Sequence, residues 1–211
     1  MTKVLAVMDD LDQTTDEVLL SRYRDEGWTA DFDVLVHRYE RELFRYLVRY
    51  TGDAALADDV FQNTFLQVHL KRALYEDGRP VRPWLYSIAT HQAVDALRKA
   101  GRHPTISLDL RGAAGKGDSD PSALVDLLVA AEDGPLSELQ EEERKKWVRT
   151  AIDRLPESLK QTLLLAYFQD LKYREIAEIQ KIPVGTVKSR LHAALAKLQE
   201  MAKAAHFDGS D

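Results

Sequence analysis

Six residues near the C-terminal end of the chain are suited to contact nucleic acid. Lysine, arginine and histidine side chains offer N–H donors to phosphates and base edges, and serine and threonine add hydroxyl groups. A glycine among them allows the backbone to approach a ligand closely. The residues are Gly185, Thr186, Lys188, Ser189, Arg190 and His192. Their types and spacing favour contact with duplex DNA.

Two short helices joined by a tight corner are needed to position these residues. Helical periodicity predicts a first helix over 173–180, a break at Lys181 and Ile182, and a second helix that starts at Pro183. This is the outline of a helix-turn-helix, whose second helix enters the major groove. An ordinary amphipathic hairpin with a solvated basic face is the alternative.

A second group of candidate residues falls on a helix expected after Pro80 and Pro83. Trp84, His91 and Arg98 are seven residues apart, so they line up along one side of that helix. Aromatic rings and guanidinium groups along one stripe suit unstacked bases and a single-stranded backbone. The full set of candidates is Arg82, Trp84, Ser87, Thr90, His91 and Arg98. In the alternative, Trp84 packs in the core and Arg98 pairs with Asp95.

Three amphipathic helices are expected ahead of residue 103, and the last of them carries that stripe. The first is predicted to begin with Asp31 as its cap and to end at Gly52, and the second to begin at Asp53. Before them, Thr14 to Glu17 is interpreted as a capping box of a short helix. No long alternating pattern predicts a strand, so the expected fold is all-α with two domains.

In order and spacing, these segments resemble the sigma-70 superfamily of RNA polymerase sigma factors, specifically the short extracytoplasmic-function (ECF) type. The matching residues are Phe32 to Tyr39 with Tyr46, Asp58 to Phe65, Trp84 to Ala89 with Asp95, Leu97 and Arg98, Leu155 and Pro156, Tyr173 to Ala177, and Gly185 to Leu191. The resemblance implies a region 2 domain over 1–103 and a region 4 domain over 137–205. Residues 104–136 would be an acidic linker and 206–211 a tail.

The resemblance also implies roles for individual residues. The stripe on the third helix would hold the melted minus-ten strand. The second helix of the helix-turn-helix would read the minus-thirty-five duplex, with Tyr173 and Arg174 added from the first. One exposed face would dock on the clamp helices of the polymerase beta-prime subunit, through Asp58, Asp59, Gln62 and Asn63. Further implied partners are the polymerase beta flap and a possible anti-sigma factor.

The chain departs from the family pattern at several of these positions. His91 replaces a frequent asparagine at the entrance to the minus-ten base pocket, and Asn63 replaces a usual glutamate. Lys181 stands where a turn glycine is preferred, at a cost of about 1 kcal/mol if it is left-handed. Ala193 replaces a frequent basic residue. The promoter sequence therefore does not follow from the resemblance.

The formal charge of −6 is concentrated in one stretch of the sequence. Residues 104–143 hold ten acidic and two basic side chains, a net charge of −8, so the remainder carries +2. Their glycine- and serine-rich part indicates a flexible tether between two domains. The sharper alternatives are that this stretch threads a basic polymerase channel or masks the basic helices.

Composition argues against an enzyme, a metalloprotein and a membrane protein. Cysteine is absent, the six histidines show no metal-ligand spacing, and Asp58 and Asp59 are adjacent and so diverge on a helix. No catalytic residue, metal or cofactor is expected. The apolar run of residues 1–8 is too short for a signal peptide or a membrane span, which predicts a cytoplasmic location.

The function predicted from the sequence is that of an initiation sigma factor, which binds core RNA polymerase and promoter DNA and helps to open that DNA. One alternative is an autonomous helix-turn-helix regulator that dimerises on a palindromic operator and has no polymerase-docking role. Another is an interaction protein that has lost DNA binding and titrates the polymerase or a regulator. The basic residues Lys188 and Arg190 argue against the second alternative, whereas Ala193 leaves it open.

Overall fold

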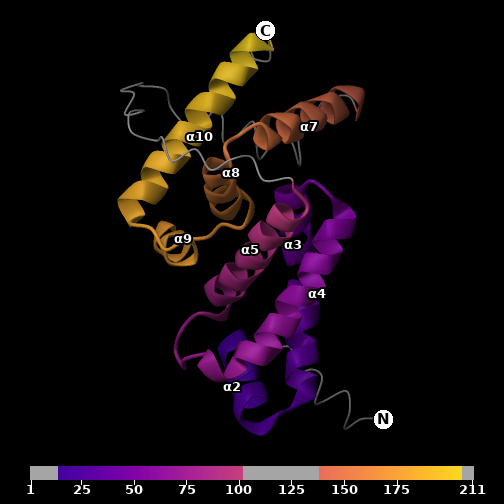
Figure 1. The fold of residues 1–211 in the computed structure, drawn as a ribbon, viewed down its shortest axis with the longest axis vertical. Helices are drawn as coiled ribbons and strands as arrows, with labels where there is room; N and C mark the ends of the chain where they lie inside the picture. The colour runs from indigo at the N-terminus through magenta and orange to yellow at the C-terminus, as the bar shows by residue number, and fades with distance from the viewer. Residues whose placement is uncertain (1–13, 102–137, 206–211) are drawn as a thin grey trace. The chain divides into compact units, whose positions relative to one another are not determined.

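The computed structural model of the chain describes residues 14–101 and 138–205, and every regular element in these two stretches is helical. The chain divides into two compact units between Gly101 and Arg102, drawn in Figure 1 from indigo to magenta and from orange to yellow. The predicted all-α fold with two helical domains is therefore confirmed. The predicted linker over 104–136 and tail over 206–211 lie outside the described residues, so their boundaries remain predictions.

Among the described residues of the first unit there are four α-helices. They are α2 (Asp16–Glu26), α3 (Thr29–Thr51), α4 (Ala54–Lys71) and α5 (Val81–Lys99), with a 3-10 turn, η1 (Arg72–Leu74), after α4. Helix α4 packs against α3 and α5, and α2 contacts α3 and α5. Each helix turns one apolar stripe inward, and the largest fully buried side chains are Leu19, Leu20, Leu43, Tyr46, Leu47, Tyr50 and Tyr86. The burial of these stripes decides which faces of α4 and α5 meet the solvent.

The predicted boundary between α3 and α4 is confirmed by its caps. Gly52 has a left-handed φ of 71° and closes α3 with a hydrogen bond from its N–H to the Val48 carbonyl. The Asp53 carboxylate then accepts hydrogen bonds from the Ala55 and Leu56 N–H groups at 2.9 and 3.2 Å. This reversal places α4 antiparallel to α3.

Two predicted N-terminal caps are wrong in detail. Asp31 lies inside α3 and is fully buried, where it accepts two hydrogen bonds of 2.8 Å from Arg22 on α2. A buried carboxylate needs such a partner, which outweighs its preference for a helix end. At α2 the cap is Thr15, and Glu17 accepts instead from the Val81 N–H at 3.2 Å. Both carboxylates thus join separate elements of the first unit.

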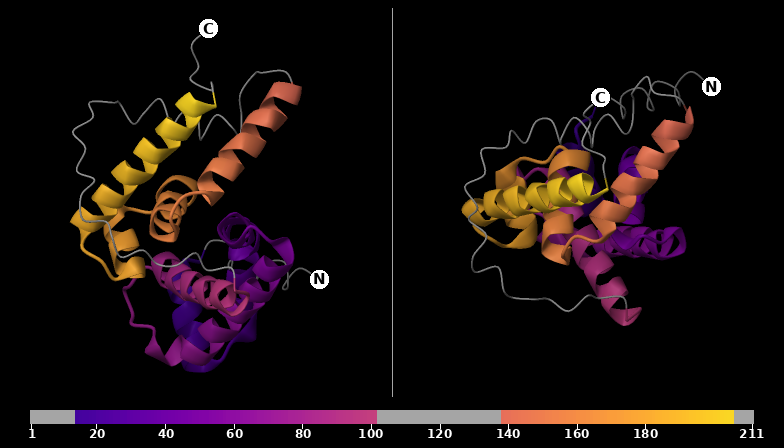
Figure 2. Two further views of the ribbon diagram at one scale, coloured as in Figure 1. Left: turned by 45° about the horizontal axis from the view of Figure 1, so that its top comes forward. Right: turned by 90° about the horizontal axis from the view of Figure 1, so that it is seen from above.

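The second unit is built on one long helix. Within residues 138–205 its elements are α7 (Glu138–Asp153), α8 (Glu157–Leu163) continued by a π-helical turn, η2 (Leu164–Phe168), then α9 (Tyr173–Gln180) and α10 (Val184–Ala204). Figure 2 shows α9 at the N-terminal end of α10, and α7 reaches toward its C-terminal end. The buried stripe of α10 comprises Val187, Leu191, Ala194, Leu195, Leu198 and Ala202.

The corner between α9 and α10 confirms the predicted helix-turn-helix. Helix α9 has the predicted bounds, and Lys181 is left-handed at φ 53° and ψ 46°. The Ile182 N–H donates to the Ala177 carbonyl at 3.0 Å, which satisfies the end of α9. Pro183 takes the N-cap position, one residue before the first helical position expected for it. The corner therefore holds a lysine where a glycine would be unstrained.

We predict that Lys181→Gly stabilises the protein by about 1 kcal/mol, because glycine adopts the left-handed conformation without a steric penalty. Chemical denaturation of the full chain measures the change. The matched control is Lys197→Gly, at an exposed lysine inside α10. There the backbone is helical and glycine lowers helix propensity, so the control should lose about 1 kcal/mol. If both variants lose stability equally, the corner is not strained.

Candidate nucleic-acid interface

The N-terminal half of α10 turns a polar surface outward. Gly185, Lys188, Ser189 and His192 are exposed and Thr186 is half-buried, whereas Val187 is buried. The Ser189 hydroxyl donates to the Thr186 carbonyl at 3.0 Å, so its proton is used within the helix and its oxygen remains an acceptor. The structure thus brings the predicted duplex-reading residues of α10 onto one side of the helix.

Helix α9 adds two candidates at its first turn. Tyr173 and Arg174 are both exposed, and Tyr173 is the only large apolar side chain of the second unit's described residues with more than 40% of its surface exposed. The backbone N–H of Lys172 donates to the Glu175 carboxylate at 2.7 Å, which closes the start of the helix. Both side chains are therefore available to a ligand.

Arg190 is half-buried, and its guanidinium is held by a side chain of α9. Its Nη1 donates to the Gln180 Oε1 at 3.0 Å, and burial lowers the pKa of its guanidinium. The sequence grouped Arg190 with the duplex-contacting residues and gave no sign of Gln180 as its partner. Because the contact crosses between two helices, periodicity within either helix does not reveal it.

On α5 the predicted single-strand stripe is only partly exposed. His91 and Arg98 are exposed, whereas Trp84 and Ser87 are half-buried. Trp84 packs against Tyr75 in an edge-on arrangement with ring centroids 5.4 Å apart. Trp84 therefore combines the two roles considered from the sequence, since one part of the ring packs and the rest meets the solvent.

Hydrogen bonds order the exposed part of the stripe. The Ser87 hydroxyl donates to the Trp84 carbonyl at 2.7 Å, and the His91 Nδ1 lies at hydrogen-bond distance from the Ser87 carbonyl. With that carbonyl as the acceptor, Nδ1 carries the proton. Arg98 forms the expected exposed ion pair with Asp95, at 3.2 Å. Such a pair contributes little to stability, so Arg98 can exchange its partner for a phosphate.

Two members of the predicted stripe are held by the protein itself. Thr90 is 2% exposed, and its hydroxyl is hydrogen-bonded to the Tyr46 hydroxyl at 2.9 Å, so the prediction that Thr90 contacts DNA is wrong. Arg82 is half-buried over the Tyr86 ring, with its Nε 3.3 Å from Glu42. Burial raises the pKa of Tyr86, so its hydroxyl stays neutral beside this pair.

A third surface lies on α4. The predicted docking residues Asp58, Asp59, Gln62 and Asn63 are all exposed, and the Gln62 amide donates to the Asp58 carboxylate at 2.9 Å. Asp59 and Asn63 also line a groove of about 370 Å³ between α4 and the C-terminal half of α5. All four docking residues are therefore accessible from one side of α4.

Sequence reasoning missed the apolar continuation of this surface. Leu66 and Leu70 are 52% and 61% exposed, one and two turns beyond Gln62 on the same helix, and Leu74 in η1 is 71% exposed. Exposed leucines at four-residue spacing mark a contact surface. The signal was present in the sequence, because α4 has more apolar residues than one buried stripe requires.

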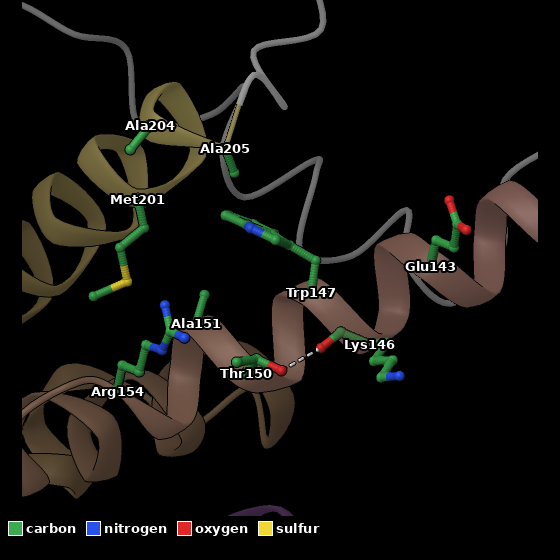
Figure 3. Close-up of a pocket in the computed structure, with 9 residues that line it drawn as sticks. All are labelled: Glu143, Lys146, Trp147, Thr150, Ala151, Arg154, Met201, Ala204 and Ala205. Carbon is green, nitrogen blue, oxygen red and sulfur yellow. Dashed lines mark hydrogen bonds between the residues drawn. The ribbon is translucent and has the colours of Figure 1, made fainter.

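A groove between α7 and α10 completes the candidate surfaces (Figure 3). Its volume is about 520 Å³, and Trp147 points across it toward Met201 and Ala205. The remaining lining residues are Glu143, Lys146, Thr150, Ala151, Arg154 and Ala204. An apolar floor with charged groups at the edge suits a helix with one apolar face.

The described residues hold no group of three or more histidine, aspartate or glutamate side chains placed to bind a metal ion. In residues 14–101 and 138–205, no helix is both long and apolar enough to cross a membrane.

Thr90→Val tests the placement of Thr90. We predict a loss of about 1 to 3 kcal/mol in unfolding free energy, because the buried hydrogen bond between the Thr90 and Tyr46 hydroxyls is lost. Affinity for a single-stranded oligonucleotide, measured per folded molecule, should be unchanged. Thr90→Ser keeps the hydroxyl and serves as the control. A drop in oligonucleotide affinity without a loss of stability would return Thr90 to the binding surface.

Two family profiles match the chain, one in each unit. Sigma-70 region 2 matches residues 35–103, and Sigma-70, region 4 matches residues 145–198. The region 2 match includes α4 and α5 with their exposed surfaces. The region 4 match includes α8, α9 and most of α10.

Relatives of known role match over most of their length. The RNA polymerase sigma-H factor of Pseudomonas aeruginosa is 32% identical over 87% of this chain and 92% of its own. The ECF RNA polymerase sigma factor SigW of Bacillus subtilis is 30% identical over 80% of this chain and 87% of its own.

Solved structures of low sequence identity share the fold. CnrH, in complex with the cytosolic domain of CnrY, has a TM-score of 0.63 at 20% identity and covers 90% of this chain and 97% of its own. RpoE of Bartonella quintana, in complex with the anti-sigma factor NepR, has a TM-score of 0.59 at 21% identity, with coverages of 82% and 97%.

Proposed function

The chain belongs to the ECF type of the sigma-70 family of RNA polymerase sigma factors, and from this we infer that it initiates transcription. It binds core RNA polymerase, recognises promoter DNA and helps to open it. One observation carries this inference: a region 2 unit and a region 4 unit occur in one chain. The region 2 unit exposes polar side chains on α4 and α5, and the region 4 unit exposes polar side chains on α9 and α10. The autonomous regulator is not favoured, because it has no use for the region 2 unit.

We propose that each unit contacts a different part of the promoter. In the second unit, Lys188, Ser189 and His192 face outward at the N-terminal half of α10, the part of a recognition helix that enters the major groove. In the first unit, the exposed part of the half-buried Trp84 ring, on the same helix as the exposed His91, offers a stacking surface to an unpaired base. The second unit thus reads the minus-thirty-five duplex, and the first holds the melted minus-ten strand.

Polymerase docking is proposed for the exposed face of α4. Asp59 and Gln62 supply polar contacts to the beta-prime clamp helices, and Leu66 and Leu70 supply apolar area beside them. A central apolar patch with a polar rim is the usual composition of a protein interface. A duplex would be repelled by the carboxylates, which leaves a protein as the partner of this face.

A second polymerase contact, to the beta flap, is proposed for the groove between α7 and α10. Trp147 and Met201 provide the apolar floor that an amphipathic helix needs. Met201 lies 13 residues beyond Lys188 on one helix, which corresponds to about 20 Å. Because the groove and the reading surface lie at opposite ends of α10, the unit can hold polymerase and DNA together.

The remaining parts of the proposal follow from family membership. The chain has no chemistry of its own, since nucleotide addition belongs to the polymerase, and it acts in the cytoplasm with core polymerase and promoter DNA. An anti-sigma factor is proposed as a regulatory partner, and the two solved relatives are each bound to another protein. Run-off transcription with core polymerase on a randomised promoter library tests the function and reads the promoter motif together.

We predict that Asp59→Arg with Gln62→Ala spares folding and weakens core polymerase binding by about 2 kcal/mol or more, because the substitutions reverse a charge and remove an amide at the interface. Co-purification with core polymerase measures the loss. The control is Asp33→Arg, an exposed carboxylate on α3. If the double variant still initiates transcription normally, α4 is not the docking face.

Lys188→Ala tests base reading by α10. A lysine that contacts a base edge should cost about 1 to 3 kcal/mol on the best duplex and less on its single-base variants, so preference relaxes at one or two positions. Binding to a set of single-base-pair variants measures this. The exposed Lys197 lies 9 residues further along α10, and Lys197→Ala is the control. Equal losses on every duplex would assign Lys188 to phosphate.

A further inference from the structure

One side chain connects three helices at the corner of the helix-turn-helix. Gln180 is the last residue of α9, and its Oε1 lies 3.0 Å from the Thr162 hydroxyl on α8, which shares its single proton between this oxygen and the Ser158 carbonyl at 2.7 Å. The same oxygen accepts from the Arg190 Nη1 on α10, also at 3.0 Å. Thr162 is fully buried, so the amide is anchored to the core on one side and to the reading helix on the other.

In the part of the chain that the structure describes, the charge of Arg190 has no acidic counterpart nearby. Among the described residues, no carboxylate lies within ion-pair distance of its guanidinium, although the side chain is half-buried and burial lowers its pKa. Two half-buried arginines of the first unit form ion pairs with aspartates. Arg22 pairs with Asp31 at 2.8 Å, and Arg38 pairs with Asp16 at 2.6 Å. In these the positive charge is compensated within the fold.

A neutral amide oxygen accepts a hydrogen bond and leaves the charge of the donor intact. The guanidinium has five N–H donors in a rigid plane, and the contact with Gln180 uses one of them. The plane is therefore held in place while other donors remain for a ligand with paired oxygens, such as a phosphate. A fixed arginine also loses less side-chain entropy when that ligand binds.

We propose that Gln180 is a positioning residue for DNA binding, which holds Arg190 by a neutral acceptor so that the arginine meets a backbone phosphate as a fixed and uncompensated cation. The proposal rests on the proposed function, because it requires α10 to meet a duplex. It assigns a DNA role to a residue that does not touch DNA itself. Glutamate at the same position would keep the geometry and cancel the charge.

Gln180→Glu is the sharpest test, since the two side chains have the same shape and both can accept from Thr162 and Arg190. The full-length chain is titrated with a mixed-sequence duplex of about 30 base pairs between about 50 and 200 mM salt. We expect unchanged or higher thermal stability, a fivefold to tenfold weaker affinity at low salt (on the order of one phosphate contact), and a log–log salt slope smaller by about one. A purely structural role predicts no loss of affinity.

Two further variants separate position from charge. Gln180→Leu removes the acceptor and keeps the volume, so Arg190 keeps its charge and loses its support; affinity per folded molecule should fall while the salt slope stays close to native. Arg190→Ala should lower the slope by about one, and adding Gln180→Glu to it should change the slope no further. The control for net charge is Gln199→Glu, at a half-buried glutamine that lies nine residues beyond Arg190 on α10.

The outcomes distinguish this inference from the proposed function. If the native chain binds the duplex and Gln180→Glu binds with the same affinity and slope, the inference fails and the proposed function stands. If Gln199→Glu lowers the slope as much as Gln180→Glu, the effect is one of net charge and the inference also fails. If the native chain shows no salt-dependent duplex binding, the proposed role of α10 in DNA binding fails first.

Discussion

Burial of one apolar stripe on each helix is the constraint on which the rest of this structure depends. On α10 the stripe includes Val187, Leu191 and Leu198, each less than 5% exposed. Burying one such side chain stabilises a fold by about 1.5 to 3 kcal/mol, whereas an exposed ion pair contributes at most about 1 kcal/mol. A rotation of α10 that buried Lys188 would expose several of these apolar side chains and lose the free energy of their burial. Apolar packing alone therefore fixes the outward direction of the reading residues.

Polar contacts of the first unit add to this apolar packing. They fix residues 75–79, the segment that precedes α5 and its single-strand stripe. The Arg24 guanidinium donates to the Tyr75 carbonyl at 2.9 Å and to Asp77 at 3.0 Å, which ties the segment to α2. Burial raises the pKa of Tyr75 to about 12, so its hydroxyl stays protonated and donates to the Arg79 carbonyl. The Tyr75 ring then supports Trp84, which sets the direction in which the tryptophan can meet a base.

Periodicity and capping residues were enough to predict α2 to α5, α9 and α10, because these signals are local in sequence, whereas α7 and α8 were not predicted. The bounds of α9 and the caps at Gly52 and Asp53 followed from them. The errors concern side chains whose partners lie on another helix. Thr90 falls on the same stripe as exposed residues, yet its hydroxyl faces Tyr46 on α3, and Asp31 pairs with an arginine of α2. Spacing along one helix carries no information about such partners.

The same limit applies to charge, and it explains how an acidic chain can carry a DNA-binding surface. The net charge of −6 is a sum over the whole sequence, whereas salt screens exposed charges over about 8 to 10 Å. Within that distance of a phosphate, what matters is whether a nearby cation is already compensated. The charges of Arg22 and Arg38 are compensated by their aspartates, whereas Arg190 is held by the neutral amide of Gln180. Attraction to DNA is therefore decided by the pairing of individual arginines, and the total charge of the chain is a poor guide to it.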